Sequence, residues 1–213
     1  MNADASAGAS SRGGASGRFE AMDSFPAFFP LSGRRVVIVG IGEHAEGKAR
    51  LFEGSPAVLD RVDDGRALDP DAYRGAVLAF IASGDAAFDE LAANAAREAG
   101  VPVNVVDRTE LCDFFTPALV DRGQVVAAVG TGGASPVLAQ VLKQELEGAI
   151  PEGAGRVAAL LQEFRKALQA AYPDLQQRRT FVLGLLEGPA AQAAMEGRMD
   201  EARTLLGEAL SGR

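Results

Sequence analysis

The stretch "VVIVGIGEHAEGKARLF", residues 36–52, joins a run of apolar β-branched residues to a segment of helical pattern through two glycines. The run predicts a buried strand, and the segment after the turn predicts a helix. The turn has the form G-x-G-x-x-A, which lets the backbone approach a pyrophosphate and packs the helix closely on the strand. The N–H groups at the start of the helix would then bind the phosphates. The sequence therefore predicts a dinucleotide site at Gly40, Gly42, Glu43 and His44.

An acidic residue follows the turn at the spacing that such a site requires. Asp60 lies 20 residues after Gly40, at the end of the apolar run "AVLD". A carboxylate there would accept hydrogen bonds from the ribose hydroxyls of NAD and would repel the additional phosphate of NADP. The alternative interpretation is a glycine-rich turn that binds no ligand. His44 has no carboxylate partner in the nearby sequence, so we interpret it as a surface residue and not as a catalytic base.

Short apolar runs alternate with helical patterns from residue 33 to about residue 106. This alternation predicts an α/β domain whose parallel sheet is covered on both faces. The stretch 61–75 is short and polar, so we expect a shortened Rossmann domain. Further along, "ALVDRGQVVAAVG" predicts a hairpin, and "GTGGASP" predicts a turn that begins a helix at Ser135. From residue 151 to the end the pattern is helical.

Composition excludes several classes of protein. The net charge of −8 argues against a nucleic-acid-binding protein, although it allows a local basic site for an anion. The single cysteine, Cys112, excludes an intramolecular disulfide and fits a reducing compartment. The sequence has no apolar stretch near the ~20 residues of a membrane span, no secretory signal and no cluster with metal-ligand spacing. We therefore expect a cytoplasmic protein with no bound metal.

The strongest candidate for a catalytic carboxylate is Asp107, which ends the run "VPVNVVD" together with Asn104. Chemistry in an open α/β sheet gathers outside the carboxyl ends of the strands, so Asp107 could accept a proton or orient a substrate nitrogen there. The alternative is a helix N-cap for "RTELCDF", with Glu110 closing a capping box. Spacing alone leaves both interpretations open. Cys112 has no partner nearby and is interpreted as a buried thiol and not as a nucleophile.

Two longer segments, "NVVDRTELCDF" and "VDRGQVVAAVGTGGASPVLA", together with the glycine turn, resemble the precorrin-2 dehydrogenase module of the sirohaem synthase family. The resemblance runs from about residue 25 to residue 210. It implies NAD-dependent oxidation of precorrin-2 to sirohydrochlorin by a cytoplasmic homodimer. Two alternatives stay open, namely a bifunctional dehydrogenase and ferrochelatase, and a non-catalytic NAD-binding regulatory module. Because the chain ends at Arg213, we do not expect the methyltransferase activity of fused family members.

The resemblance also implies roles for individual residues. Asp107 matches the family's catalytic acid/base, the glycine turn matches its dinucleotide loop, and Asp60 with residues 61–63 matches its ribose contact. The cofactor-binding residues so predicted include Arg61. The residues predicted to line the tetrapyrrole cleft are Asn104, Thr131, Gly132, Gly133 and Ser135.

The implied organisation has four parts: a disordered leader over 1–21, an NAD-binding Rossmann domain over 22–112, a dimerisation region over 113–150 and a C-terminal helical domain over 151–213. Because precorrin-2 carries eight carboxylates, we also expect a basic rim around the substrate. The candidates for this rim all lie in the second half of the chain: Arg122, Lys143, Arg156, Arg165, Lys166, Arg178 and Arg179.

Overall fold

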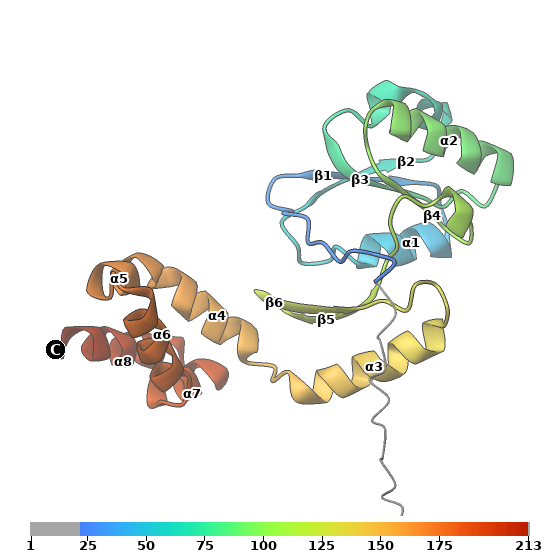
Figure 1. Cartoon of the computed structure of the whole chain (residues 1–213). Coiled ribbons are helices and arrows are strands. Elements are labelled where there is room, and N and C mark those ends of the chain that lie inside the picture. Colours follow the sequence, from blue (N-terminus) through green and yellow to red (C-terminus); the bar gives the residue numbers. More distant parts are fainter. Residues whose placement is uncertain (1–21, 213) are drawn as a thin grey trace, which may run out of the picture.

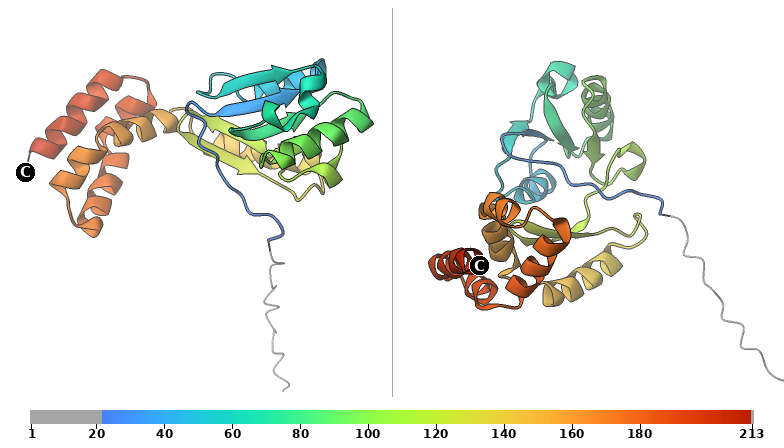
Figure 2. Two further views of the ribbon diagram at one scale, coloured as in Figure 1. Left: turned by 90° about the horizontal axis from the view of Figure 1, so that it is seen from above. Right: turned by 60° about the vertical axis from the view of Figure 1, so that its left-hand side comes forward.

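The computed structural model describes residues 22–212. The leader expected over 1–21 lies outside the described residues. The described chain forms a parallel sheet covered by helices, then a β-hairpin with one long helix, and then a group of five shorter helices (Figure 1). Those C-terminal helices lie to one side of the parallel sheet (Figure 2). This is the three-part α/β architecture that the sequence predicts.

The parallel sheet has four strands in the order β2-β1-β3-β4. Its elements are β1 (Arg35–Val39), α1 (Glu43–Arg50), β2 (Val58–Val62), β3 (Ala76–Ile81), α2 (Ala86–Glu98) and β4 (Val103–Val105). Between β2 and β3 the chain makes only two short 3₁₀ turns, η1 (Gly65–Leu68) and η2 (Pro70–Ala72). The predicted shortening of the Rossmann domain is therefore confirmed. From β1 the chain passes first to β2 on one side and later to β3 on the other, which opens a crevice at the carboxyl ends of β1 and β3.

Alternating residues of the strands build two apolar cores, one on each face of the sheet. Val37 and Val39 point to the face that α2 covers, whereas Val36 and Ile38 point to the face of α1. Figure 1 shows the two helices on opposite sides of the sheet. Strands buried on both faces explain why these runs are apolar throughout.

The hairpin consists of β5 (Ala118–Arg122) and β6 (Val125–Val129), which pair antiparallel. The tight turn has Gly123 at φ 75°, and its N–H donates to Asp121 Oδ1 at 2.7 Å. Helix α3 (Pro136–Ala149) follows and packs on the hairpin; its N-cap is Ser135, whose hydroxyl accepts from the N–H of Leu138 at 3.1 Å. The predicted hairpin and the predicted start of α3 are thus confirmed.

The remaining helices are α4 (Ala154–Glu163), α5 (Arg165–Ala171), α6 (Leu175–Leu186), α7 (Pro189–Met195) and α8 (Met199–Ser211). Helices α4, α6, α7 and α8 share a core of their own that includes Leu160 and Leu206, both fully buried. The start of α4 lies directly against the hairpin, because a Cβ at Gly155 would overlap the carbonyl oxygen of Arg122. Among residues 22–212, no helix has the length and apolar character needed to cross a membrane.

Candidate active site

The first glycine of the turn is required by close packing at the end of β1. Gly40 has φ 106°, and its N–H donates to the carbonyl of Val62 at 2.9 Å. A Cβ at this position would overlap the carbonyl oxygen of Ala82, just after β3. Gly40 therefore lets the turn lie across the carboxyl ends of neighbouring strands.

The second glycine of the turn faces open space. Gly42 is the N-cap of α1 with φ 83° and ψ −170°, and a Cβ there would meet no atom within 4 Å. The first helical hydrogen bond runs from the N–H of Glu46 to the carbonyl of Gly42 at 3.0 Å. Within the described residues, the N–H groups of Glu43 and His44 therefore have no acceptor. A diphosphate fits the turn at Gly42, because its oxygens can accept hydrogen bonds from the free N–H groups of Glu43 and His44 at the positive end of α1.

The structure corrects the position of the predicted ribose-binding residues. Strand β2 does not end at Asp60 but continues to Val62, because Arg61 and Val62 complete the pairing with β1. Asp60 lies mid-strand and forms an ion pair with Arg35 at 3.0 Å. The prediction that Asp60 ends the strand is therefore wrong. The carboxylate directly after β2 is that of Asp63, which is exposed.

Arg61 links two elements of the turn region. Its guanidinium forms a two-pronged ion pair with Glu46 on α1, at 2.5 and 2.8 Å, and this pairing lowers the pKa of the Glu46 carboxyl. The ion pair joins β2 to α1, so the guanidinium of Arg61 is already paired with a carboxylate of the protein. Its predicted contact with the ribose stays a prediction.

Asp107 lies at the carboxyl end of β4, as the sequence predicts. It is exposed, has φ 58°, and its carboxylate accepts no hydrogen bond from the described residues. The residue before the following 3₁₀ turn η3 (Thr109–Leu111) is Arg108, and no side chain caps that turn. Glu110 forms an ion pair with Arg108 and closes no capping box. The capping interpretation of Asp107 is therefore wrong.

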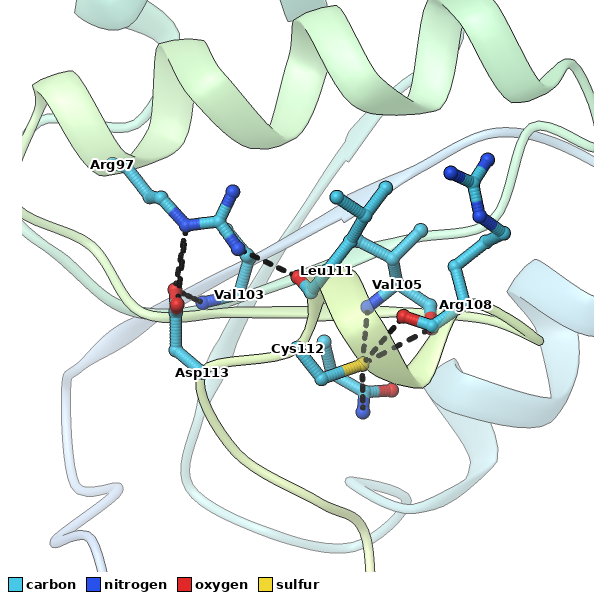
Figure 3. A network of polar contacts seen from close by, with 8 residues as sticks. Arg97, Val103, Val105, Arg108, Leu111, Cys112 and Asp113 are labelled. Carbon is cyan, nitrogen blue, oxygen red and sulfur yellow. Dashed lines mark hydrogen bonds and ion pairs between the residues drawn. The ribbon is translucent and has the colours of Figure 1, made fainter.

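The segment after Asp107 is fastened to β4 by the network that Figure 3 shows. Asp113 accepts from the N–H of Val103 at 3.0 Å and from Arg97 of α2 at 3.1 Å. The thiol of Cys112 contacts the N–H and the carbonyl of Val105, both at 3.3 Å, and burial raises its pKa. These contacts fit the interpretation of Cys112 as a structural thiol, and they fix the loop that presents Asp107.

Asn104 belongs to the same scaffold. It is 6% exposed in β4, and its Nδ2 donates to the carbonyl of Phe114 at 3.0 Å. The side chain binds the returning chain through Nδ2, whereas its Oδ1 has no hydrogen-bond partner among the described residues. The predicted contact of Asn104 with substrate stays a prediction.

A hollow at the carboxyl ends of β3 and β4 brings together Asp107, His44 and Gly84. His44 comes from the first turn of α1, so the hollow joins the glycine turn to the free carboxylate. Its side wall includes Asp89, a buried carboxylate that accepts from the N–H and the hydroxyl of Ser83 at 3.1 and 2.6 Å. A ring bound here would lie beside Asp107.

The glycine-rich loop between β6 and α3 folds on itself. The hydroxyl of Thr131 donates to the carbonyl of Ser135 and accepts from its N–H, both at 3.2 Å. Gly132 and Gly133 both have positive φ, at 61° and 81°. These residues do not line the hollow beside Asp107. Their contact with the tetrapyrrole stays a prediction.

Sequence reasoning missed Lys48, one helical turn after His44 on α1. Its ammonium donates to Thr116 Oγ1 at 3.3 Å and lies 5.4 Å from the ring centroid of Phe80. Burial lowers the pKa of this ammonium, and the charge of Asp107 opposes the shift. The i, i+4 spacing of His44 and Lys48 could have indicated that they share a helix face.

Together, the four parallel strands, the glycine turn and the carboxyl-edge hollow define the Rossmann class of nucleotide-binding proteins. Residues 27–118 match the family described as putative NAD(P)-binding, and residues 153–210 match the sirohaem synthase dimerisation region. The siroheme synthase of Azotobacter vinelandii (strain DJ / ATCC BAA-1303) is 40% identical over 209 residues, covering 90% of this chain and 45% of the relative. The chain is therefore similar to siroheme synthases along nearly its whole length.

Other comparisons agree on this relationship. The siroheme synthase of Methylococcus capsulatus (strain ATCC 33009 / NCIMB 11132 / Bath) is 38% identical, covering 88% of this chain and 44% of the relative. The chain thus spans less than half the length of these curated relatives. The solved structure of SirC, precorrin-2 dehydrogenase, has the same fold, with a TM-score of 0.57 at 16% identity, over 84% of this chain and 100% of that one.

The matched dimerisation region differs from the one in the predicted domain organisation. The family description applies to residues 153–210, which form helices α4 to α8, whereas the sequence analysis assigns dimerisation to 113–150. The predicted boundaries themselves stay a prediction.

Proposed function

We propose that the protein is a cytoplasmic oxidoreductase that oxidises precorrin-2 to sirohydrochlorin with NAD⁺. The observation that carries the proposal is the free carboxylate of Asp107, which lies beside the dinucleotide turn in one hollow. The relationship to the siroheme synthases and the fold shared with SirC, precorrin-2 dehydrogenase, support it. In the reaction, the reduced macrocycle loses a hydride and a proton, and the products are sirohydrochlorin, NADH and H⁺.

The cofactor site is built from residues of the first βα unit and the end of β2. Gly42 and the N–H groups of Glu43 and His44 hold the pyrophosphate, for the reasons given above. Asp63, directly after β2, takes the ribose role that was predicted for Asp60, since ribose contacts come from the carboxyl end of that strand. When bound, NAD⁺ supplies the hydride acceptor.

Asp107 is the residue that accepts the proton lost by the macrocycle or orients the pyrrole ring beside the cofactor. Its side chain forms no hydrogen bond within the described chain, so it can approach a pyrrole N–H or accept the proton released with the hydride. The surrounding network of Cys112 and Asp113 holds its loop in place, which keeps the carboxylate beside the hollow without occupying it.

Incubation of the purified chain with precorrin-2 and NAD⁺ tests this function through the absorbance of NADH. We expect NADH and sirohydrochlorin to form in equal amounts. Binding of NAD⁺ without turnover would contradict the proposal and would favour the non-catalytic regulatory module. Adding Fe²⁺ to sirohydrochlorin in the same cuvette examines the ferrochelatase alternative, with the iron as substrate.

The protein is also proposed to act as a homodimer, and α3 supplies a surface for its partner. The outer face of α3 exposes an apolar stripe in which Val137, Leu138 and Val141 are 73%, 49% and 48% exposed. Such a stripe is costly in water and suits a second copy across a two-fold axis. The matched sirohaem synthase dimerisation region, which begins just beyond α3, supports an assembly of two copies.

We predict a dimer at micromolar concentration by light scattering. Changing both Val137→Glu and Val141→Glu should convert most of the protein to monomer, because burying unpaired carboxylates in an apolar contact is unfavourable. The control is the pair Leu91→Glu and Asn94→Asp, which adds two carboxylates at exposed positions of α2, away from α3. A wild-type monomer, or a double variant that stays dimeric, would contradict this interface.

A further inference from the structure

Lys48 carries a half-buried charge that the protein does not neutralise. Within residues 22–212, no carboxylate lies within 4.0 Å of its ammonium, whose one hydrogen bond goes to the neutral hydroxyl of Thr116. The ammonium has three N–H donors, so two remain free. Removing a cation from water without an anionic partner is unfavourable, and such a group is best explained by an anion that binds it.

The side chain of Lys48 lies in a hollow of the protein surface and does not extend freely into solvent. Lys48 and Thr116 line a hollow with Gly47, His44 and Val106. His44 and Val106 also line the hollow of Asp107, so the two hollows adjoin. The ring of Phe80 lies beneath the ammonium and limits its motion.

Four of the seven basic residues that the sequence predicts for a substrate rim are already occupied within the protein. Arg122 donates to the carbonyls of Ile150 and Glu147, and Arg156 donates to those of Ala194 and Met195.

Two more members of that predicted rim are also occupied within the protein. Lys143 forms an ion pair with Glu147 at 2.9 Å, and Arg178 donates to the carbonyl of Tyr172 at 2.7 Å. Lys48, by contrast, is half-buried, unneutralised and next to the proposed catalytic carboxylate.

We propose that Lys48 and Thr116 form a binding site for one carboxylate of the tetrapyrrole substrate. This inference rests on the proposed function, because it takes the polycarboxylate macrocycle as the ligand. A carboxylate on Lys48 would anchor the edge of the macrocycle at the junction of α1 with the segment that leads into β5 (Figure 1). The remainder of the ring would then extend across Val106 toward Asp107.

The test measures the Kd of sirohydrochlorin for the full chain by absorbance or fluorescence titration. Lys48→Met should raise this Kd by about tenfold to a hundredfold, the usual effect of losing a hydrogen bond to a charged group. Lys48→Arg keeps the positive charge, so it should raise the Kd of sirohydrochlorin by a smaller factor than Lys48→Met. The charge-matched control is Arg203→Met on α8, where the arginine pairs with Glu163 and Asp200, and it should bind as wild type.

Three outcomes overturn the inference. Equal affinities of wild type and Lys48→Met for sirohydrochlorin reject the carboxylate site alone. A variant that loses NAD⁺ affinity but keeps sirohydrochlorin affinity shows that Lys48 binds the cofactor's phosphates instead. A wild-type chain that binds no sirohydrochlorin rejects the proposed function and this site with it. Should Lys48→Met fail to fold in a thermal melt, Lys48→Gln, which retains polarity, replaces it in the same titration.

Discussion

Replacement of Asp107 by asparagine is expected to lower the turnover of precorrin-2 by about 10²–10⁴-fold, the range that general base catalysis supplies. Asparagine is nearly isosteric with aspartate, and both tolerate the left-handed backbone that Asp107 adopts at φ 58°. The amide cannot accept a proton as a carboxylate does. Because the side chain of Asp107 forms no hydrogen bond within the described chain, the substitution should lower the stability of the fold only a little. The measurement is steady-state NADH production together with thermal unfolding.

The matched control for this prediction is Glu110→Gln. Glu110 is an exposed carboxylate three residues further on, and within residues 22–212 its only ion pair is with Arg108. It should retain wild-type turnover. If Asp107→Asn keeps wild-type NADH production while it folds normally, then another group handles the proton and the proposed role of Asp107 is lost.

The second large effect is expected at Gly42. Gly42→Val should weaken NAD⁺ binding by at least about 100-fold, because the new side chain occupies the phosphate-binding turn and deprives the phosphates of charge-assisted hydrogen bonds. The space around a Cβ at Gly42 is empty of protein atoms within 4 Å, so the substitution causes no clash inside the chain. The positive φ adds strain of about 1–3 kcal/mol. Isothermal calorimetry with NAD⁺ gives the affinity directly.

Gly54→Val tests the effect of backbone strain alone, without any change to the phosphate-binding turn at Gly42. Gly54 also has a positive φ, at 72°, and open space around a Cβ, but it lies in the turn after α1. It should lower the melting temperature in a similar way and keep NAD⁺ affinity. Unchanged NAD⁺ affinity in Gly42→Val would mean that the turn does not hold the cofactor.

The sequence predicted those features that depend on local pattern. Apolar runs are visible as strands, and the glycine turn has fixed spacing, so the shortened parallel sheet, the hairpin and the start of α3 at Ser135 could all be inferred. The position of Asp107 also followed, because it comes directly after the apolar run that forms β4. The sequence could not show that Asp107 caps no helix, because this depends on whether the 3₁₀ turn begins at Asp107 or one residue later.

The errors come from properties that only the folded chain determines. Asp60 looked like a strand end because Arg61 interrupts the apolar run, yet the pairing with β1 carries β2 two residues further. The burial of Asn104 beside the returning chain at Phe114 is likewise a property of the folded chain, and its predicted substrate contact stays untested. Lys48 was missed because its hydrogen-bond partner, Thr116, lies 68 positions away in the sequence.

The contact between Gly155 and the carbonyl of Arg122 has a mechanical consequence. The backbones of the hairpin and of α4 meet there with no side chain between them, so any side chain at position 155 would force the two apart. Residues 115–117 connect the hairpin to the nucleotide-binding half, after Asp113 and Phe114 have bonded to β4. Thr116 lies in that connection and Lys48 on α1, so an anion bound by both would bridge the nucleotide-binding half and the segment that leads into the hairpin.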